Sequence, residues 1–201
     1  MSNKSDISLQ NILITSATED NNEFIPFIAN DSEMQIDSSE IPNPLPILAL
    51  RNAVLFPGVV IPISVGREKS LKLVREQYSK DKIIGAISQI DSKIEEPNQE
   101  DLYKIGTIGQ ILKILEMPDG STTVILQGIK RFELNQIVET EPYFKGQITE
   151  LEDVAPSSPH HDYDAIVSSV KDLALKIIKL SPNIPNEASF AIRNIDNPSF
   201  L

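Results

Sequence analysis

The sequence predicts an α+β protein in which a β-rich subdomain, interrupted by one helix, is followed by a smaller helical subdomain. Three observations support this prediction. Between residues 45 and 154, short apolar segments alternate with turns that contain Pro or Gly, a pattern typical of a closed or nearly closed barrel-like sheet. One stretch within this region has helical spacing instead. After the linker Ala155–Pro159, apolar residues recur with a helical period, which places the helical subdomain at residues 155–201.

Residues 1–44 are predicted to form an acidic, disordered arm. They carry eight acidic residues against Lys4 and few periodic apolar positions, so they cannot bury enough apolar surface to fold. The short apolar segments Ile12–Ile14 and Phe24–Ile28 could dock on a neighbouring surface, but a solvated tail is the favoured interpretation. The whole chain has a net charge of −11. Since no cluster of Lys and Arg offsets this charge, no nucleic-acid binding is expected.

The β subdomain is predicted to contain six or seven strands. Pro44 and Pro46 exclude a helix at its start, and Pro62 favours an edge or bulge position for its strand. Phe56-Pro57-Gly58 predicts a turn, and Pro118-Asp119-Gly120 predicts a hairpin. The predicted strands are Leu45–Leu50, Val59–Val65, Ile83–Ile90, Ile105–Met117, Thr122–Ile129, Phe132–Val138 and Tyr143–Leu151.

Three helices are predicted. Arg67–Ser79 interrupts the strands, with an apolar face and with Gly66 as its cap. A longer amphipathic helix follows the linker and ends at Ser181-Pro182, and a shorter one covers Asn186–Ile195. Asn197-Pro198 has the form of a further helix start, so we expect the chain to be a fragment of a longer polypeptide. The apolar positions of the longer helix are Tyr163, Ile166, Val167, Val170, Leu173, Ala174 and Ile177.

No catalytic, cofactor-binding or metal-binding residues are predicted in this chain. None of its eight Gly residues is followed by Lys, which a phosphate-binding P-loop requires, and no G-x-S-x-G nucleophile turn is present. Gly106 and Gly109 form a GxxG that we interpret as a bend or close backbone approach in a sheet. His160 and His161 are more typical of a linker or helix cap than of a metal site. A binding role is therefore favoured over catalysis.

A cytoplasmic location is the default expectation, with no role at a membrane. The chain has no cysteine, which fits a reducing compartment, and its N-terminus lacks the apolar core of a signal peptide. Its apolar runs are of strand length and are broken by Pro or Gly.

An ordered series of short strings resembles the N-terminal domain of the Lon protease family. The chain departs from the family pattern at Ala49, where Pro is usual, and at Ser64, where Leu or Phe is common. The resemblance covers residues 45–201. The strings are Leu45-Pro46-Ile47-Leu48-Ala49-Leu50-Arg51-Asn52, Val54-Leu55-Phe56-Pro57-Gly58, Ile61-Pro62-Ile63-Ser64-Val65-Gly66-Arg67-Glu68-Lys69-Ser70, Gly106-Thr107-Ile108, Met117-Pro118-Asp119-Gly120 and Asn194-Ile195-Asp196-Asn197-Pro198.

The resemblance implies a PUA-like β-barrel subdomain followed by a helical one. It also implies that the parent protein continues into an ATPase that uses ATP and Mg²⁺, and then into a serine protease with a Ser–Lys dyad. The N-terminal domain of such a protein would capture unfolded or tagged proteins and would support self-association into a hexamer. Two other possibilities stay open, which are a free-standing protein- or RNA-binding module and a small enzyme.

Six residues are predicted to contact protein substrates. The hypothesis rests on an apolar turn that lies next in sequence to a helix face of mixed charge, a combination suited to unfolded chains. The alternative, that Phe56 is a core residue and that the charges only confer solubility, is favoured. The six residues are Phe56, Pro57, Arg67, Glu68, Lys69 and Lys72.

Overall fold

The computed structural model describes residues 27–28, 37–117, 120–152, 161–181 and 188–193. Its contacts divide the chain into two units, Met1–Leu151 and Glu152–Leu201. The first unit holds all described strands and the second holds two helices, so the class is α+β, as the sequence predicts. Among the described residues, no helix is long and apolar enough to cross a membrane.

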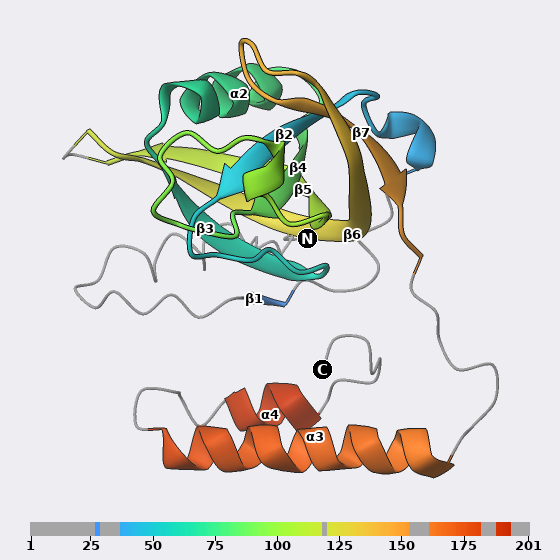
Figure 1. The fold of residues 1–201 in the computed structure, drawn as a ribbon. Coiled ribbons are helices and arrows are strands. Elements are labelled where there is room, and N and C mark those ends of the chain that lie inside the picture. Colours follow the sequence, from blue (N-terminus) through green and yellow to red (C-terminus); the bar gives the residue numbers. More distant parts are fainter. Residues whose placement is uncertain (1–26, 29–36, 118–119, 153–160, 182–187, 194–201) are drawn as a thin grey trace, which may run out of the picture. The chain divides into compact units, whose positions relative to one another are not determined.

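The first unit is a single mixed sheet of seven strands (Figure 1). The strands follow the order β1-β3-β6-β5-β4-β2-β7, and β6 also pairs with β7. Because β7 pairs with β2, β2 with β4, β4 with β5 and β5 with β6, the ladder of strand pairs returns to its starting point. The strands are β1 (Phe27–Ile28), β2 (Leu45–Leu50), β3 (Val59–Val65), β4 (Ile83–Ser88), β5 (Ile105–Glu116), β6 (Thr122–Glu139) and β7 (Lys145–Glu150).

The long strand β6 pairs with different strands along its length. Its first part pairs with β3 at Thr122–Gln127, and its last part pairs with β7 at Phe132–Glu139. Register shifts occur in the β5 ladder and in the β7 ladder, and such bulges bend a strand and increase its twist. This bending lets one strand pass from the first set of partners to the second.

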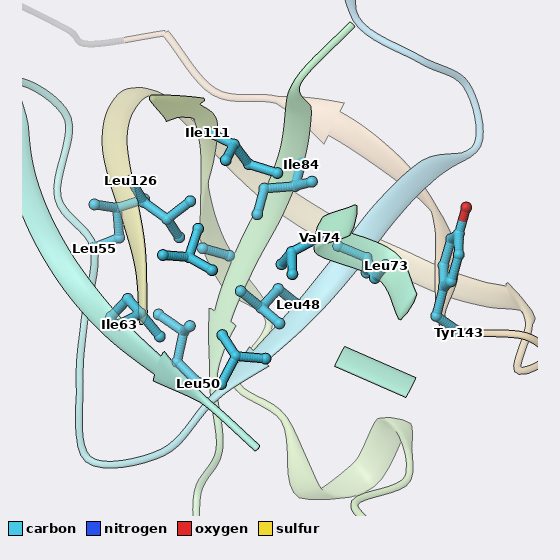
Figure 2. Close-up of a cluster of buried hydrophobic side chains, with 13 residues drawn as sticks. Leu48, Leu50, Leu55, Ile63, Leu73, Val74, Ile84, Ile111, Leu126 and Tyr143 are labelled. Atoms are coloured by element: carbon cyan, nitrogen blue, oxygen red, sulfur yellow. The ribbon is translucent and has the colours of Figure 1, made fainter. Parts of the chain in front are cut away.

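Two large clusters of buried side chains fill most of the unit, and a third, small one contains Val60 and Ile125. One joins strands β2, β3, β4, β5 and β6 to helix α2 (Glu68–Tyr78), and Figure 2 shows Leu73 and Val74 of this helix beside Leu48 and Ile84. The other large cluster surrounds Phe132, which is completely buried. The buried residues of α2 are Leu73, Val74 and Gln77. Because Gln77 lies one helical turn after Leu73 and Val74, all three are on the same face of the helix, and this face covers one side of the first cluster.

The second unit contains α3 (His161–Leu180) and α4 (Ala188–Arg193), which contact each other. Ile178 of α3 is buried. Asp162 and Asp164 lie in the first turn of α3, where carboxylates interact favourably with the positive end of the helix dipole. His161 is the first residue of α3, which agrees with a role at the helix start, whereas His160 lies outside the described residues.

Several sequence-based boundaries need correction. The two strands predicted at Thr122–Ile129 and Phe132–Val138 are one continuous strand, β6. The N-cap of α2 is Arg67 rather than Gly66, and its side chain makes no capping hydrogen bond. Phe27–Ile28, within the segment predicted to be a disordered arm, pair with β3. The apolar segment Ile12–Ile14 and the residues Asn197-Pro198 lie outside the described part of the chain.

Candidate functional site

The loop between β2 and β3 is attached to the sheet by hydrogen bonds to its backbone groups. Ser88 Oγ donates to the carbonyl of Ala53 at 2.6 Å, and Thr107 Oγ1 donates to that of Leu55 at 2.6 Å. Further along, the Gly58 N–H donates to the Gly128 carbonyl at 3.0 Å. Gly58 has a φ of 76°, a conformation that favours glycine and allows the chain to turn into β3. The loop is therefore held at three points by strands β4, β5 and β6.

Within this loop, buried and exposed apolar side chains alternate. Leu55 is buried in the first core cluster, whereas Val54 is 54% exposed and Phe56 is 60% exposed. Pro57 is half-buried. We call Val54, Phe56 and Pro57 the 54–57 patch. Phe56 is thus a surface residue, and the favoured sequence interpretation that it belongs to the core is wrong. Exposed apolar side chains that form a contiguous patch mark many binding surfaces.

A groove of about 720 Å³ lies at the start of α2, and we call it the α2 groove. Residues from β2, the 95–98 segment and the 140–144 segment complete its walls. Three predicted site residues line it, whereas Phe56, Pro57 and Lys72 do not. The predicted residues therefore lie on two surfaces rather than on one. The groove lining is Ile47, Ala49, Arg51, Gly66, Arg67, Glu68, Lys69, Ser70, Leu73, Glu95, Glu96, Pro97, Asn98, Thr140, Tyr143 and Phe144.

Arg67 has a structural role in this groove. Its guanidinium donates to the side-chain oxygen of Gln89 and, at 3.5 Å, to the carbonyl of Ile94. Burial and, secondarily, the nearby Arg51 lower the pKa of Arg67. Gln89 also donates to the carbonyl of Ile94 at 2.9 Å, so Arg67 and Gln89 together hold the 91–95 loop against the sheet. Both contacts are made by Nη2, while the buried Nε has no hydrogen-bond partner among the described residues. The Nη2 contacts fix the guanidinium against the 89–94 segment, so Arg67 helps to shape the groove.

Lys69 is the more accessible cation. Its Nζ lies 2.5 Å from Glu141 Oε1 and 3.3 Å from the Thr140 carbonyl. Both partners of this ion pair are largely exposed, and such pairs are worth at most about 1 kcal/mol. Lys69 can therefore leave Glu141 for another carboxylate at little cost. Glu68 and Lys72 are exposed on the same helix.

Tyr143 lines the α2 groove and is hydrogen-bonded to Gln77 of α2. Gln77 Nε2 lies 3.1 Å from the Tyr143 hydroxyl oxygen, and both side chains are buried. Burial is the main cause that raises the pKa of the Tyr143 phenol, since it disfavours the phenolate. The phenol is therefore neutral at physiological pH, and Figure 2 shows its ring beside Leu73 of α2.

Helix α3 of the second unit has an exposed apolar surface. The sequence shows the apolar positions of this helix but not which of them are exposed. Five exposed apolar side chains of α3 follow one another at alternating intervals of four and three residues. This spacing is that of a coiled-coil seam. We call this set the α3 stripe, and it consists of Ile166, Val170, Leu173, Ile177 and Leu180.

Two other sequence interpretations concern the GxxG glycines and possible metal sites. Gly106 and Gly109 are buried within β5, and a Cβ at either would crowd neighbouring side chains, which agrees with a close approach in a sheet. Within the described ranges, no group of three or more His, Asp or Glu residues could hold a metal ion. The arrangement offers exposed apolar side chains and exposed charges of both signs.

Residues 44–201 match the family described as the ATP-dependent protease La (LON) substrate-binding domain. The chain belongs to this family. Its Lon protease relatives include that of Flavobacterium johnsoniae, which is 52% identical over 179 residues, and that of Cytophaga hutchinsonii, which is 44% identical over 179 residues. Each match covers 89% of this chain and 22% of the relative. The chain thus spans about a fifth of the length of these Lon proteases.

Two solved structures of Lon N-terminal domains have the same fold. The N-terminal domain of a Mycobacterium avium complex Lon protease matches with a TM-score of 0.63 at 16% identity, over 78% of each chain. A Lon N-terminal domain protein from Xanthomonas campestris matches with a TM-score of 0.51 at 18% identity, over 77% of this chain and 91% of the other. These likenesses concern the fold.

Proposed function

We propose that this chain captures unfolded or tagged protein segments for a Lon-type ATP-dependent serine protease. The observation that carries the proposal is the 54–57 patch, where Phe56 is 60% exposed on a loop fixed by buried Leu55. Unfolded proteins differ from folded ones by exposing apolar side chains, and a fixed apolar surface recognises that difference without reading a sequence. ATP, Mg²⁺ and peptide-bond hydrolysis belong, in this proposal, to other parts of the longer protein.

The proposal extends to the architecture and the place of action. We infer that the closed ladder of the first unit is a PUA-like barrel, with residues 1–44 as an arm, 45–154 as the barrel and 155–201 as a helical subdomain. We place the protein in the cytoplasm, with no bound cofactor in this segment and no role in nucleic-acid binding. A gel shift that weakens steeply with salt would instead support the RNA-binding alternative.

The charged rim of the α2 groove gives the patch a complement. Lys69 and Glu68 of the groove, with Lys72 outside it on the same helix, offer both signs of charge, so they can pair with either charged flank of a captured segment. Each such contact is weak in water. In a ring of six copies, the weak contacts of one unfolded chain would act together, because each further contact forms within one complex.

Removing the apolar side chains of the patch is expected to weaken capture without unfolding the domain. The double variant Val54→Ser, Phe56→Ser should bind reduced, carboxymethylated α-lactalbumin about tenfold more weakly, equivalent to about 1.4 kcal/mol. Because both side chains are already more than half exposed, its free energy of unfolding should change by less than about 1 kcal/mol. Fluorescence anisotropy measures the binding, and urea denaturation measures the stability.

Tyr103→Ser provides the matched control, because Tyr103 is also large, apolar and about half exposed but lies outside the patch. It should bind the probe as the unaltered chain does. Equal affinity of the patch variant and the unaltered chain would exclude the patch as the binding surface. Adding Lys69→Glu to the patch variant should change the salt dependence of any remaining binding.

The α3 stripe favours a second role, self-association through the helical unit. A seam at coiled-coil spacing is self-complementary, so two copies can bury the same five side chains against each other. We expect the chain to associate with rising concentration in sedimentation velocity, and Leu173→Glu with Ile177→Glu to keep it monomeric. The control is Lys176→Glu, which changes an exposed charge of α3 outside the stripe. A chain that sediments as a monomer at every concentration would contradict this role.

A further inference from the structure

Strand β3 has one edge that is only partly covered. Along its inner edge, residues Val60–Val65 pair with β6. Along its outer edge, β1 pairs only with Val59 and Val60. For the remaining five residues, Ile61–Val65, no strand within the described ranges lies on that side. An edge of this kind presents backbone N–H and C=O groups to any extended chain.

The occupant of this edge is a short antiparallel strand from far away in the sequence. The partner residues are Phe27 with Val60 and Ile28 with Val59, so the contact consists of two residue pairs. Strand β1 is labelled in Figure 1. The pairing shows that the edge accepts an antiparallel strand at this register. Two pairs are few, because strands in sheets are usually about five residues long.

The surroundings of the occupied stretch are apolar. Val60 is buried in a small cluster with Ile125, and Leu112 and Leu115 pack against it. The Val59 N–H donates to the Phe56 carbonyl at 3.2 Å, so the turn that carries the 54–57 patch leads directly into this edge. A peptide paired with Val59 and Val60 would therefore meet both backbone groups and apolar side chains.

Pro62 limits how far such a peptide can pair. Proline has no N–H, and its place in β3 agrees with the edge position that the sequence predicts. A guest strand would lose a hydrogen bond at Pro62, so pairing is confined mainly to Val59–Ile61. This limit keeps the addition short and protects the edge from open-ended aggregation.

We propose that the outer edge of β3 at Val59–Ile61 receives an extended apolar segment of an unfolded protein as an antiparallel strand, which displaces β1. The proposal rests on the proposed capture of unfolded proteins and gives it a mode of binding. Main-chain hydrogen bonds supply affinity for any extended sequence, and the adjacent apolar side chains select apolar ones. β1 is then a tethered competitor that keeps the edge covered when no unfolded protein is present.

The chain segment that links β1 to β3 makes the binding of unfolded segments selective. Thirty residues separate Ile28 from Val59, so β1 stays close to its site and rebinds readily after leaving it. A guest must therefore bind better than this local competitor. Long, apolar, extended segments meet that requirement because they also contact the 54–57 patch, whereas short or polar ones do not.

A reversible covalent lock tests the proposal directly. The chain has no cysteine, so Ile28→Cys with Val59→Cys introduces one possible disulfide, between residues that face each other across the two strands. Such partners have Cα atoms about 4.5 or 5.5 Å apart, within the range that a disulfide spans. The oxidised form should bind reduced, carboxymethylated α-lactalbumin about tenfold more weakly than its own reduced form, equivalent to about 1.4 kcal/mol.

The controls separate this proposal from the function on which it rests. Ile28→Ser with Val59→Ser, treated with the same oxidant, should bind equally before and after reduction. Ile28→Pro, which removes a donor from β1, should bind the probe more tightly than the unaltered chain. If the locked and reduced forms bind equally well, or if the disulfide does not form, displacement of β1 is excluded while capture at the patch stands. If the unaltered chain does not bind the probe at all, the proposed function itself is wrong.

Discussion

Replacing Gly128 with alanine is expected to lower the free energy of unfolding by about 3 kcal/mol. Gly128 lies in β6, beneath the loop between β2 and β3. A Cβ there would overlap the carbonyl oxygen of Phe56 and lie 2.8 Å from its carbonyl carbon and 3.2 Å from Leu55 Cγ. The first two atoms belong to the backbone, which cannot turn aside as a flexible side chain can. The loop must therefore lift away from the sheet.

Lifting the loop breaks more than one contact. The hydrogen bond from the Gly58 N–H to the Gly128 carbonyl is 3.0 Å long and lies at the crowded position. Leu55 is part of the first core cluster, so its displacement also exposes apolar surface. We expect probe binding to fall as well, because the same movement displaces Phe56 and the 54–57 patch.

Thermal and urea denaturation of Gly128→Ala measure the loss. A loss of about 3 kcal/mol corresponds to a fall in Tm of about 6–12 °C for a chain of this size. Gly66→Ala is the matched control, since a Cβ at Gly66 would have no atom within 4 Å and its φ is not in the left-handed region. Equal stability of the two variants would show that the loop is not packed against β6 as described.

Much of the sheet could be predicted from the sequence because its strands are short and bounded by Pro and Gly. Leu45–Leu50 and Val59–Val65 have the predicted limits in the structure. The continuity of β6 could not be predicted, since the polar residues near Lys130 and Arg131 look like a break between two strands. In the structure, these residues pair with Ile108 and Thr107 of β5. Tertiary pairing therefore overrode the local pattern.

The candidate site was predictable only where the signal is local. The turn at Phe56-Pro57-Gly58 was found from its residue types, but the exposure of Phe56 depends on how Leu55 is anchored to β4, β5 and β6. Arg67 was predicted as a contact residue from its place beside a helix. Its partners lie 22 and 27 residues away, at Gln89 and Ile94, and no local pattern indicates them. The pairing of Phe27–Ile28 with β3 was missed for the same reason.

Replacing Phe132 with alanine is expected to lower the free energy of unfolding by about 4 kcal/mol. Its ring is completely buried in the second core cluster, among residues of β2, β4, β5 and β6. The Cβ positions of Gly85 and Gly106 would each lie 2.8 Å from its Cζ. The ring therefore fills the space that two glycines on neighbouring strands leave open, and its removal creates a cavity that the strands cannot close.

A double-mutant cycle tests this account more sharply than the single change. The three atoms nearest to a Cβ at Gly85 all belong to side chains, those of Ile47, Leu45 and Phe132. Gly85→Ala should therefore destabilise the unaltered chain but cost much less when Phe132→Ala has already vacated the space, giving a coupling free energy of about 1 kcal/mol or more. Phe56→Ala, which truncates an exposed ring of the same size, should cost less than about 1 kcal/mol. If the losses in free energy of unfolding caused by Gly85→Ala and Phe132→Ala are strictly additive, the ring does not occupy this space. Packing of the Phe132 ring would then not explain how the interior of the closed ladder is filled.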